Sequence, residues 1–321
     1  MRICIVGCGA IGSVFAAHLA QLPELEVWGY DTSAAHVDAI NRDGLRVIGG
    51  EELVARVNAT AEPDRIPPCD LGIVAVKGTF TEAAIAAIAH AFEDAAVCSV
   101  QNGIGNEEVI AQHVPRVMRG VTLPAARVVR PGVVEVAGAG TTWVGPFEPQ
   151  PATLNEVQQL GVVLNRSGLE TRAVADARGA QWTKLLFNCA TNPLCALTGL
   201  THGQLCELSA TQGVVAEVLR EGRAVADACT ITLEEDPAEL VKTLGRANYD
   251  HKPSMLQDVL ARRPTEIGTL NEGLVTQADA FGIPAPVNRA VAALIRGVED
   301  SWTRKNGSHL IADGGDSALG A

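Results

Sequence analysis

The polar residues Lys184, Asn188 and Asn192 recur at every fourth position in a largely apolar stretch. At about 100° per residue they drift by only about 40° per step, so on a helix they line one face. A lysine ammonium can protonate a carbonyl oxygen, and asparagine side chains can hydrogen-bond a polar ligand. A solvated stripe is the alternative, but asparagine is a weak helix former, which favours a binding face. Pro193 is expected to kink this helix.

A glycine-rich turn near the N-terminus is a second feature with a chemical use. It lies between an apolar run and a helical pattern and reads Gly7-Cys8-Gly9-Ala10-Ile11-Gly12. Gly7 permits a tight turn, Gly9 lets the backbone approach a pyrophosphate, and Gly12 lets the helix pack closely. The N-terminus of the helix then faces the phosphates. A glycine-rich turn without a ligand is the alternative.

Asp31 stands nineteen residues after Gly12, at the end of the second apolar run. A carboxylate there can accept hydrogen bonds from the adenosine ribose, and it repels a 2′-phosphate. The next residues, 32–35, offer no Arg or Lys to hold such a phosphate. Charge therefore favours NAD over NADP. The alternative is that Asp31 only begins a turn or caps the following helix.

Lys77 and Asn102 each follow an apolar run that reads as a central strand. Open α/β sheets bind ligands at the carboxyl ends of their strands. Lys77 could therefore meet cofactor phosphate or ribose, and Asn102 the nicotinamide half. A solvated lysine and a common Asn-Gly turn are the alternatives.

These residues need a sheet and helices to position them. Strands are expected over 2–6, 25–30, 45–48, 53–58, 71–76 and 95–100, short strands within 117–147, and an edge strand over 169–173. Helices are expected over 13–21, 34–42, 81–92 and 154–167. Strands that alternate with helices indicate a doubly wound, mostly parallel sheet.

The chain is almost wholly helical in pattern after Asp176. Helices are expected over 178–196, 203–229, 236–247, 254–262, 264–281 and 285–302. The sequence thus predicts an α/β fold, with an N-terminal Rossmann-like doubly wound sheet followed by an all-helical C-terminal domain. We expect a dinucleotide-binding domain over 1–175, a helical substrate and catalytic domain over 176–302, and a disordered tail over 303–321.

The composition excludes several kinds of partner. With 321 residues and a net charge of −12, the chain is not expected to bind nucleic acid or anionic membrane. The eight cysteines are scattered among apolar residues without a CxxC pair, which favours reduced, buried thiols. Since no signal peptide or apolar run of about 18 residues is visible, we expect a cytoplasmic protein. We also expect no metal site.

Several of these motifs stand in an order that is specific to one family. From Arg2 to about Trp302 the chain resembles the ketopantoate reductase (2-dehydropantoate 2-reductase) family. The matching motifs are Gly7 to Gly12, Val76-Lys77, Gln101-Asn102-Gly103, Lys184 to Leu194, Ser254 to Asp258, Pro264 to Ile267 and Asn271. The resemblance implies hydride transfer between NAD(P)H and the keto carbon of a branched 2-oxo acid, and a homodimer.

The resemblance also implies the catalytic roles. Lys184 would be the general acid, with its ammonium donating a hydrogen bond and then a proton to the carbonyl oxygen. A lysine is protonated at neutral pH unless burial lowers its pKa. Glu266 would orient Lys184 and contact the cofactor ribose. On local evidence alone Glu266, just after Pro264, could merely complement a helix N-terminus.

The remaining implied contacts divide between cofactor and substrate. Asn102 would bridge the two ligands, while Lys77 and Ala126 would contact the cofactor. The substrate's hydroxyl and carboxylate would be bound by Asn188, Asn192 and Ser254. Locally, Ser254 could be only an N-cap that forms a capping box with Gln257.

Two positions depart from the family pattern. Many members carry Arg near 31–32, whereas this chain has Asp31-Thr32, which puts their NADP preference in doubt. His202 stands where the family often has a substrate-side Asn; it is either a substrate contact or an incidental loop residue. We therefore expect an NAD-linked ketopantoate reductase, with NADP as the alternative cofactor. The alternative functions are a dehydrogenase of the same family acting on another 2-hydroxy acid, and a non-catalytic NAD(H)-sensing protein.

Overall fold

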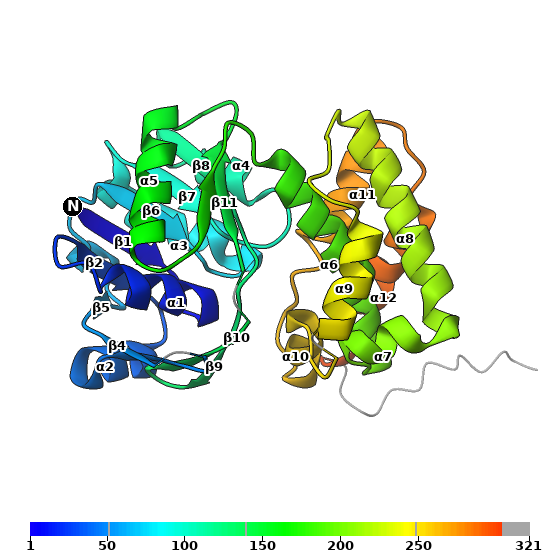
Figure 1. Cartoon of the computed structure of the whole chain (residues 1–321), viewed down its shortest axis with the longest axis horizontal. Helices are drawn as coiled ribbons and strands as arrows, with labels where there is room; N and C mark the ends of the chain where they lie inside the picture. The colour runs from blue at the N-terminus through cyan, green and yellow to red at the C-terminus, as the bar shows by residue number, and fades with distance from the viewer. Residues whose placement is uncertain (51, 139, 248, 304–321) are drawn as a thin grey trace, which may run out of the picture.

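The structure is a computed structural model that describes residues 1–303 apart from 51, 139 and 248. Except for Thr303, the tail expected over 303–321 lies outside the described residues. The N-terminal half holds sheets with flanking helices, and the C-terminal half is helical (Figure 1). The fold class expected from the sequence is confirmed.

The main sheet of the described residues has eight strands in the order β12-β11-β8-β7-β6-β1-β2-β5. Their bounds are β1 Arg2–Val6, β2 Glu26–Tyr30, β5 Asn58–Thr60, β6 Leu71–Val74, β7 Ala96–Ser99, β8 Arg116–Thr122, β11 Thr142–Pro146 and β12 Thr171–Ala173. All neighbouring pairs are parallel except β11 with β8. The chain proceeds from β1 to β2 on one side and returns to β6 on the other. The carboxyl ends of β1 and β6 therefore flank the switch point where such sheets bind ligands.

Both faces of this sheet are covered by helices. On β1, Ile3 and Ile5 join one apolar cluster while Cys4 and Val6 join another. This alternation is expected for a strand that is buried on both sides. The helices of the first cluster are α1 Ala10–Leu19, α2 Ala34–Asp43 and α5 Leu154–Arg166; those of the second are α3 Thr81–Ile88, η3 Ala89–Phe92 and α4 Asn106–Ile110. Two further short helices are η1 Pro63–Arg65 and η2 Gly78–Phe80.

A second sheet of four strands, in the order β4-β3-β10-β9, packs against α1. Its strands are β3 Leu45–Ile48, β4 Leu53–Ala55, β9 Ala125–Arg130 and β10 Val133–Gly138. The strand region expected over 53–58 is therefore divided between two sheets. Within 117–147, β8 and β11 belong to the main sheet, whereas β9 and β10 belong to the second one.

The helical half is built around α6. Its helices are α6 Arg178–Thr198, α7 His202–Glu207, α8 Ser209–Ala228, α9 Pro237–Ala247, α10 Ser254–Leu260, α11 Asn271–Ala280 and α12 Pro286–Ser301. α6 packs against α7, α8, α9, α10 and α12. The last strand ends at Ala173 and α6 begins at Arg178, while the expected domain boundary near 175 stays a prediction. No helix of the described residues is both long and apolar enough to cross a membrane.

Two expected helices were wrong in extent. The helix expected over 203–229 is divided at Leu208, whose φ of −79° and ψ of 116° are extended. The helix expected over 264–281 begins only at Asn271. The eight cysteines are free, as expected, but Cys69, Cys206 and Cys229 are only partly buried.

Candidate active site

The glycine turn connects β1 to α1 and has the geometry that its spacing predicted. Gly7 has a φ of +92°, a conformation that glycine adopts without strain. A Cβ on Gly12 would lie 1.9 Å from the Gly7 carbonyl oxygen, so only glycine lets α1 approach the turn this closely. Gly9 is the N-cap of α1, and a Cβ there would meet no atom within 4 Å. Open space in front of the unpaired N–H groups of α1 fits a pyrophosphate.

The other predicted cofactor contacts differ in burial and position. Ala10 and Ile11 form the first turn of α1 and are half-buried, whereas Cys8 is fully buried. Ala126, implied as a cofactor contact, lies on β9 opposite Val136 of β10. Because β9 packs against α1, Ala126 belongs to the layer beside the glycine turn.

Asp31 follows β2 next to the glycine turn. The N–H of Gly7 donates to the carbonyl of Tyr30, at 2.8 Å, which joins the end of β2 to the turn. The Oδ1 atom of half-buried Asp31 accepts from the Ser33 N–H at 2.8 Å. The carboxylate thus begins a turn before α2, as the alternative interpretation proposed, and no residue that the structure describes hydrogen-bonds its other oxygen.

The strand ends of the first half meet the helical half. Lys77, after β6, forms an ion pair with buried Asp258 of α10. The Asn102 side chain, after β7, donates to Glu266 Oε2 at 3.3 Å. The Gly78 N–H donates to Glu266 Oε1 at 3.2 Å. Glu266 is therefore held by two neighbouring strand ends. Lys77 was predicted to contact the cofactor, and its partner here is a carboxylate of the other half.

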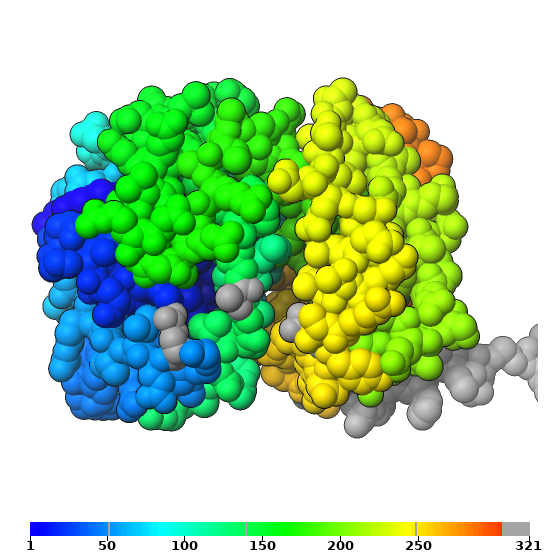
Figure 2. Space-filling view, in the orientation of Figure 1, coloured from blue at the N-terminus to red at the C-terminus, as the bar shows by residue number. Residues whose placement is uncertain are grey.

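Lys184 lies on α6 at the junction of the two halves. Its ammonium donates to the Thr122 carbonyl at the end of β8, with a distance of 2.5 Å. Burial lowers the pKa of Lys184 to about 8, and the nearby charge of Glu266 acts in the opposite direction. Burial likewise raises the pKa of Glu266, against the two hydrogen bonds that it accepts. The space-filling view shows a furrow between the two halves (Figure 2).

Asn188 and Asn192 follow Lys184 along α6 and are 6 % and 4 % exposed. The Asn192 Oδ1 accepts a long bond of 3.4 Å from the Thr191 hydroxyl. No hydrogen bond joins the Asn188 side chain to any residue that the structure describes. The side-chain amides of Asn188 and Asn192 can therefore still hydrogen-bond a ligand.

Ser254 is exposed at the first position of α10, whose N-cap is Pro253. The capping box considered from the sequence does not form, because the Gln257 side chain donates instead to the Lys252 carbonyl at 2.8 Å. The Ser254 hydroxyl therefore does not cap α10. Pro253 fixes the chain before α10 instead.

His202 is the first residue of α7 rather than a loop residue. Its ring is 7 % exposed and packs edge-on against Phe187, with His251 on another side. Burial lowers the pKa of His202 to about 4, so the ring is neutral near pH 7. Its Nε2 atom is buried without a hydrogen-bond partner among the described residues. The neutral ring can therefore donate or accept one hydrogen bond, but it cannot attract a carboxylate as a cation.

Two contacts of this site were not predicted from the sequence. Thr122 contributes only its carbonyl oxygen, which any residue type carries, so no sequence signal marks it. Asp258 lies one helical turn after Ser254, and that spacing together with the acidic side chain could have suggested a partner for Lys77.

The model of the family described as "Ketopantoate reductase PanE/ApbA" matches residues 3–149, and the one described as "Ketopantoate reductase PanE/ApbA C terminal" matches 176–299. The chain belongs to the ketopantoate reductase family. The resemblance inferred from the sequence motifs is thus confirmed.

Named relatives of this family match nearly the whole chain. The 2-dehydropantoate 2-reductase of Pyrococcus horikoshii is 34 % identical over 304 residues, which is 93 % of this chain and 98 % of the relative. The enzyme of the same name from Archaeoglobus fulgidus is 33 % identical over 302 residues, with the same coverage.

Two solved structures have the same fold. The family member from Ralstonia eutropha has a TM-score of 0.86 at 31 % identity and covers 95 % of this chain and 100 % of its own. D-mandelate dehydrogenase, solved with NADH and anilino(oxo)acetate, has a TM-score of 0.85 at 27 % identity and covers 94 % of this chain and 99 % of its own.

Proposed function

We propose that this chain reduces a branched 2-oxo acid with NAD(P)H, with ketopantoate as its substrate and pantoate as its product. The observation that carries the proposal is the ammonium of Lys184, held by the Thr122 carbonyl where α6 meets the carboxyl end of the sheet. The relatives named 2-dehydropantoate 2-reductase supply the substrate class. Glu266 and Asn102 lie at the same junction.

The proposed chemistry assigns one task to each residue. The nicotinamide, when bound along the glycine turn, supplies the hydride. Lys184 stabilises the charge that develops on the carbonyl oxygen and donates the proton. Glu266 helps to keep the buried lysine protonated, since its charge opposes the effect of burial on the pKa.

Substrate recognition is assigned to Asn188, Asn192 and Ser254, with Asn102 between substrate and cofactor. Support comes from the position of both amides along the helix face that begins with Lys184. His202 would add one neutral hydrogen-bonding group beside Phe187. On α10, the Ser254 hydroxyl is exposed and precedes the Asp258 that pairs with Lys77.

We further propose NAD rather than NADP as the cofactor, because Asp31 stands where a 2′-phosphate would need a cation. Lys77 and Ala126 are the other proposed cofactor contacts. A cytoplasmic location and a homodimer are parts of the same proposal. The sequence shows no signal peptide and no long apolar run, and the resemblance to the family implies the homodimer.

A second function is favoured by specific residues. Asp31 and His202 both depart from the family pattern, and D-mandelate dehydrogenase, a structural neighbour, was solved with NADH. The chain would then oxidise another 2-hydroxy acid with NAD. A non-catalytic sensor fits less well, because it has no use for a buried Lys184 on whose pKa the charge of Glu266 acts.

A kinetic screen tests both functions. We expect NADH oxidation to be faster with ketopantoate than with linear or aryl 2-oxo acids. With ketopantoate as the substrate, we also expect oxidation of NADH to be faster than oxidation of NADPH. Highest kcat/KM for an aryl 2-oxo acid would support the second function. If NADH binds but no 2-oxo acid is reduced, the enzymatic proposal is wrong.

The pH dependence of turnover follows from the pKa of Lys184, which burial lowers to about 8. Reduction needs the protonated ammonium, so kcat/KM for the 2-oxo acid should be level below pH 8 and fall about tenfold per pH unit above it. Oxidation needs the neutral amine and should rise toward pH 8. Steady-state rates between pH 6 and 10, with NADH affinity measured at each pH, check this. A level profile up to pH 10 would contradict it.

A further inference from the structure

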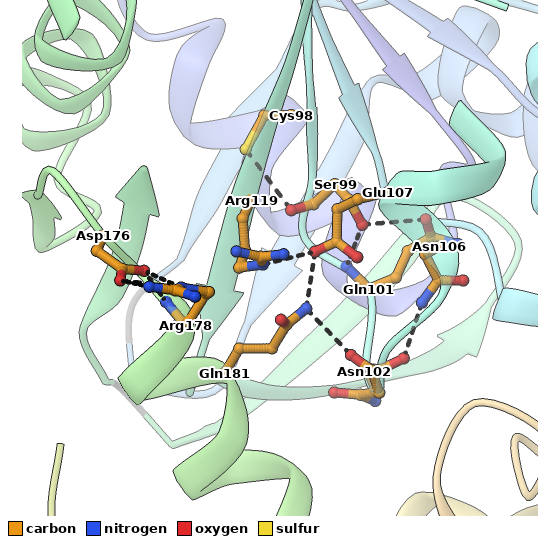
Figure 3. Close-up of polar contacts among 11 residues, drawn as sticks. Cys98, Ser99, Gln101, Asn102, Asn106, Glu107, Arg119, Asp176, Arg178 and Gln181 are labelled. Atoms are coloured by element: carbon orange, nitrogen blue, oxygen red, sulfur yellow. Dashed lines mark hydrogen bonds and ion pairs between the residues drawn. The ribbon is translucent and has the colours of Figure 1, made fainter. Parts of the chain in front are cut away.

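A buried polar cluster lies beside the proposed active site and joins the two halves of the chain. It contains Glu107 of α4, Arg119 of β8 and Gln181 of α6 (Figure 3). The Gln181 Nε2 donates to Glu107 Oε1 at 2.7 Å and to the Gly103 carbonyl at 3.2 Å. The Arg119 Nε lies 3.6 Å from the same carboxylate oxygen. Helix α6, which is distant in sequence, thus meets the consecutive elements α4 and β8 at one carboxylate.

The cluster is removed from water. Glu107 and Gln181 are 2 % and 6 % exposed, and the guanidinium of Arg119 lies over the Phe147 ring at 5.2 Å. A buried carboxylate is costly unless partners satisfy it. Burial raises the pKa of Glu107 to about 7, although Arg119 and Gln181 oppose that rise.

Other charged or titratable groups also surround Glu107. Its neighbour Glu108 on α4 raises the pKa of Glu107 further. On β7, the pKa of the Cys98 thiol is raised by burial and by the charge of Glu107. Asp176, paired with Arg178, is close enough to Arg119 for that charge to help lower its pKa. The charge of Arg119 therefore acts on the pKa of Asp176 as well as on that of Glu107.

Both partners of Glu107 lie three residues before a residue of the proposed active site. Gln181 precedes Lys184 by one turn of α6. Arg119 precedes Thr122 on β8, and the Thr122 carbonyl accepts from Lys184. Through Glu107, these two residues connect the start of α6 to the end of β8.

The second acceptor of Gln181, the Gly103 carbonyl, leads to Glu266. Gly103 follows Asn102, whose side chain donates to Glu266. The backbone at Gly103, with a φ of +87°, is so close to Thr269 that a Cβ would lie 2.2 Å from the Thr269 carbonyl oxygen. The Ile104 N–H donates to that carbonyl at 2.9 Å. Gln181 therefore joins α6 to the loop that holds Glu266.

We propose that Glu107 is a positioning residue for Lys184: through Gln181 it fixes the first turns of α6 against β8 and the 102–104 loop. This inference rests on the proposed function, because it concerns where the ammonium meets the carbonyl oxygen. A displacement of about 1 Å in such a group can cost a hundredfold in rate. A merely structural brace would lower stability without a selective effect on kcat.

Four variants separate the two roles. Gln181→Met removes the donor at similar length, and Glu107→Met removes the acceptor. Glu107→Gln keeps an oxygen for Gln181 but removes the charge opposite Arg119. The matched control is Glu221→Gln, since Glu221 is a fully buried carboxylate that accepts from Val287 and Asn288 wholly within the helical half.

We expect Gln181→Met and Glu107→Met to lower kcat about tenfold, while the Kd for NADH and the KM for the 2-oxo acid change less than about threefold. Glu107→Gln and Glu221→Gln should lower Tm but keep kcat within about threefold of the wild type. Deuterium exchange of the backbone over 178–186 should rise in both methionine variants and stay unchanged in the Glu221 control.

The proposal is overturned if both methionine variants keep wild-type kcat, or if Glu107→Gln loses as much kcat as Glu107→Met. Equal loss in Glu221→Gln would also overturn it, by reducing the effect to stability. Failure of the proposed function is distinguishable, since the wild type would then turn over no 2-oxo acid. Unchanged exchange over 178–186 in the methionine variants would still reject the positioning role in that case.

Discussion

Lys184→Met is expected to lower kcat for 2-oxo acid reduction by about three orders of magnitude. The substitution keeps the apolar stem but removes the group that stabilises the developing oxyanion and donates the proton; each effect is typically worth about 10² or more. The pH-dependent fall above pH 8 should disappear as well. Because Lys184 binds the Thr122 carbonyl and not the glycine turn, the Kd for NADH should change little.

The matched control for this prediction is Lys242→Met. Lys242 is an exposed residue of α9, and within the part of the chain that the structure describes it pairs with Glu239 across one helical turn. It should keep wild-type kcat and pH dependence. A Lys184→Met enzyme with nearly full kcat would remove the lysine from the chemistry and leave the cluster around Glu107 without a catalytic role.

The parts of the local geometry that the sequence predicted correctly carry local signals. The spacing of Gly7 and Gly12 is dictated by a contact between residues five positions apart, where a Cβ would overlap the carbonyl oxygen. The face formed by Lys184, Asn188 and Asn192 follows from helical periodicity alone. Such features depend on neighbours in the chain, so the sequence contains the information needed to recognise them.

The partners of these residues depend on topology, which local patterns do not contain. Lys77 was expected at the cofactor, yet it pairs with Asp258 from the other half of the chain. Glu107 reads as an ordinary acidic residue in the first turn of a helix. Its burial depends on the packing of α4 against β7 and β8 and on α6, which brings Gln181 to the carboxylate.

The errors in helix extent have a related cause. Helical periodicity continues through 203–229, but Leu208 adopts extended dihedral angles, which end α7 and begin α8. The same break lets α7 pack against α9 while α8 packs along α6. Tertiary packing thus overrides a continuous helical pattern.

The second large effect is expected for cofactor choice. Asp31→Asn should narrow the ratio of kcat/KM for NADH over NADPH by about tenfold or more. Two like charges about 4 Å apart in a partly solvated site repel by about 1–4 kcal/mol, and the amide removes this repulsion from the 2′-phosphate. The amide oxygen can still accept from the Ser33 N–H, so the turn before α2 should persist.

The comparison with Asp31→Ala and Asp38→Ala separates charge from structure. Asp31→Ala also loses the Ser33 bond, so any further fall in NADH use beyond that of the asparagine variant measures the turn rather than the ribose contact. Asp38 is an exposed carboxylate on α2. Asp38→Ala therefore changes the net charge by the same amount as Asp31→Ala but leaves the turn before α2 unaltered. Kd values for both cofactors from nicotinamide fluorescence would complete the test. If the preference is unchanged in both Asp31 variants, the carboxylate serves only the turn, and the choice between the two cofactors must lie in other residues around α1 and β9.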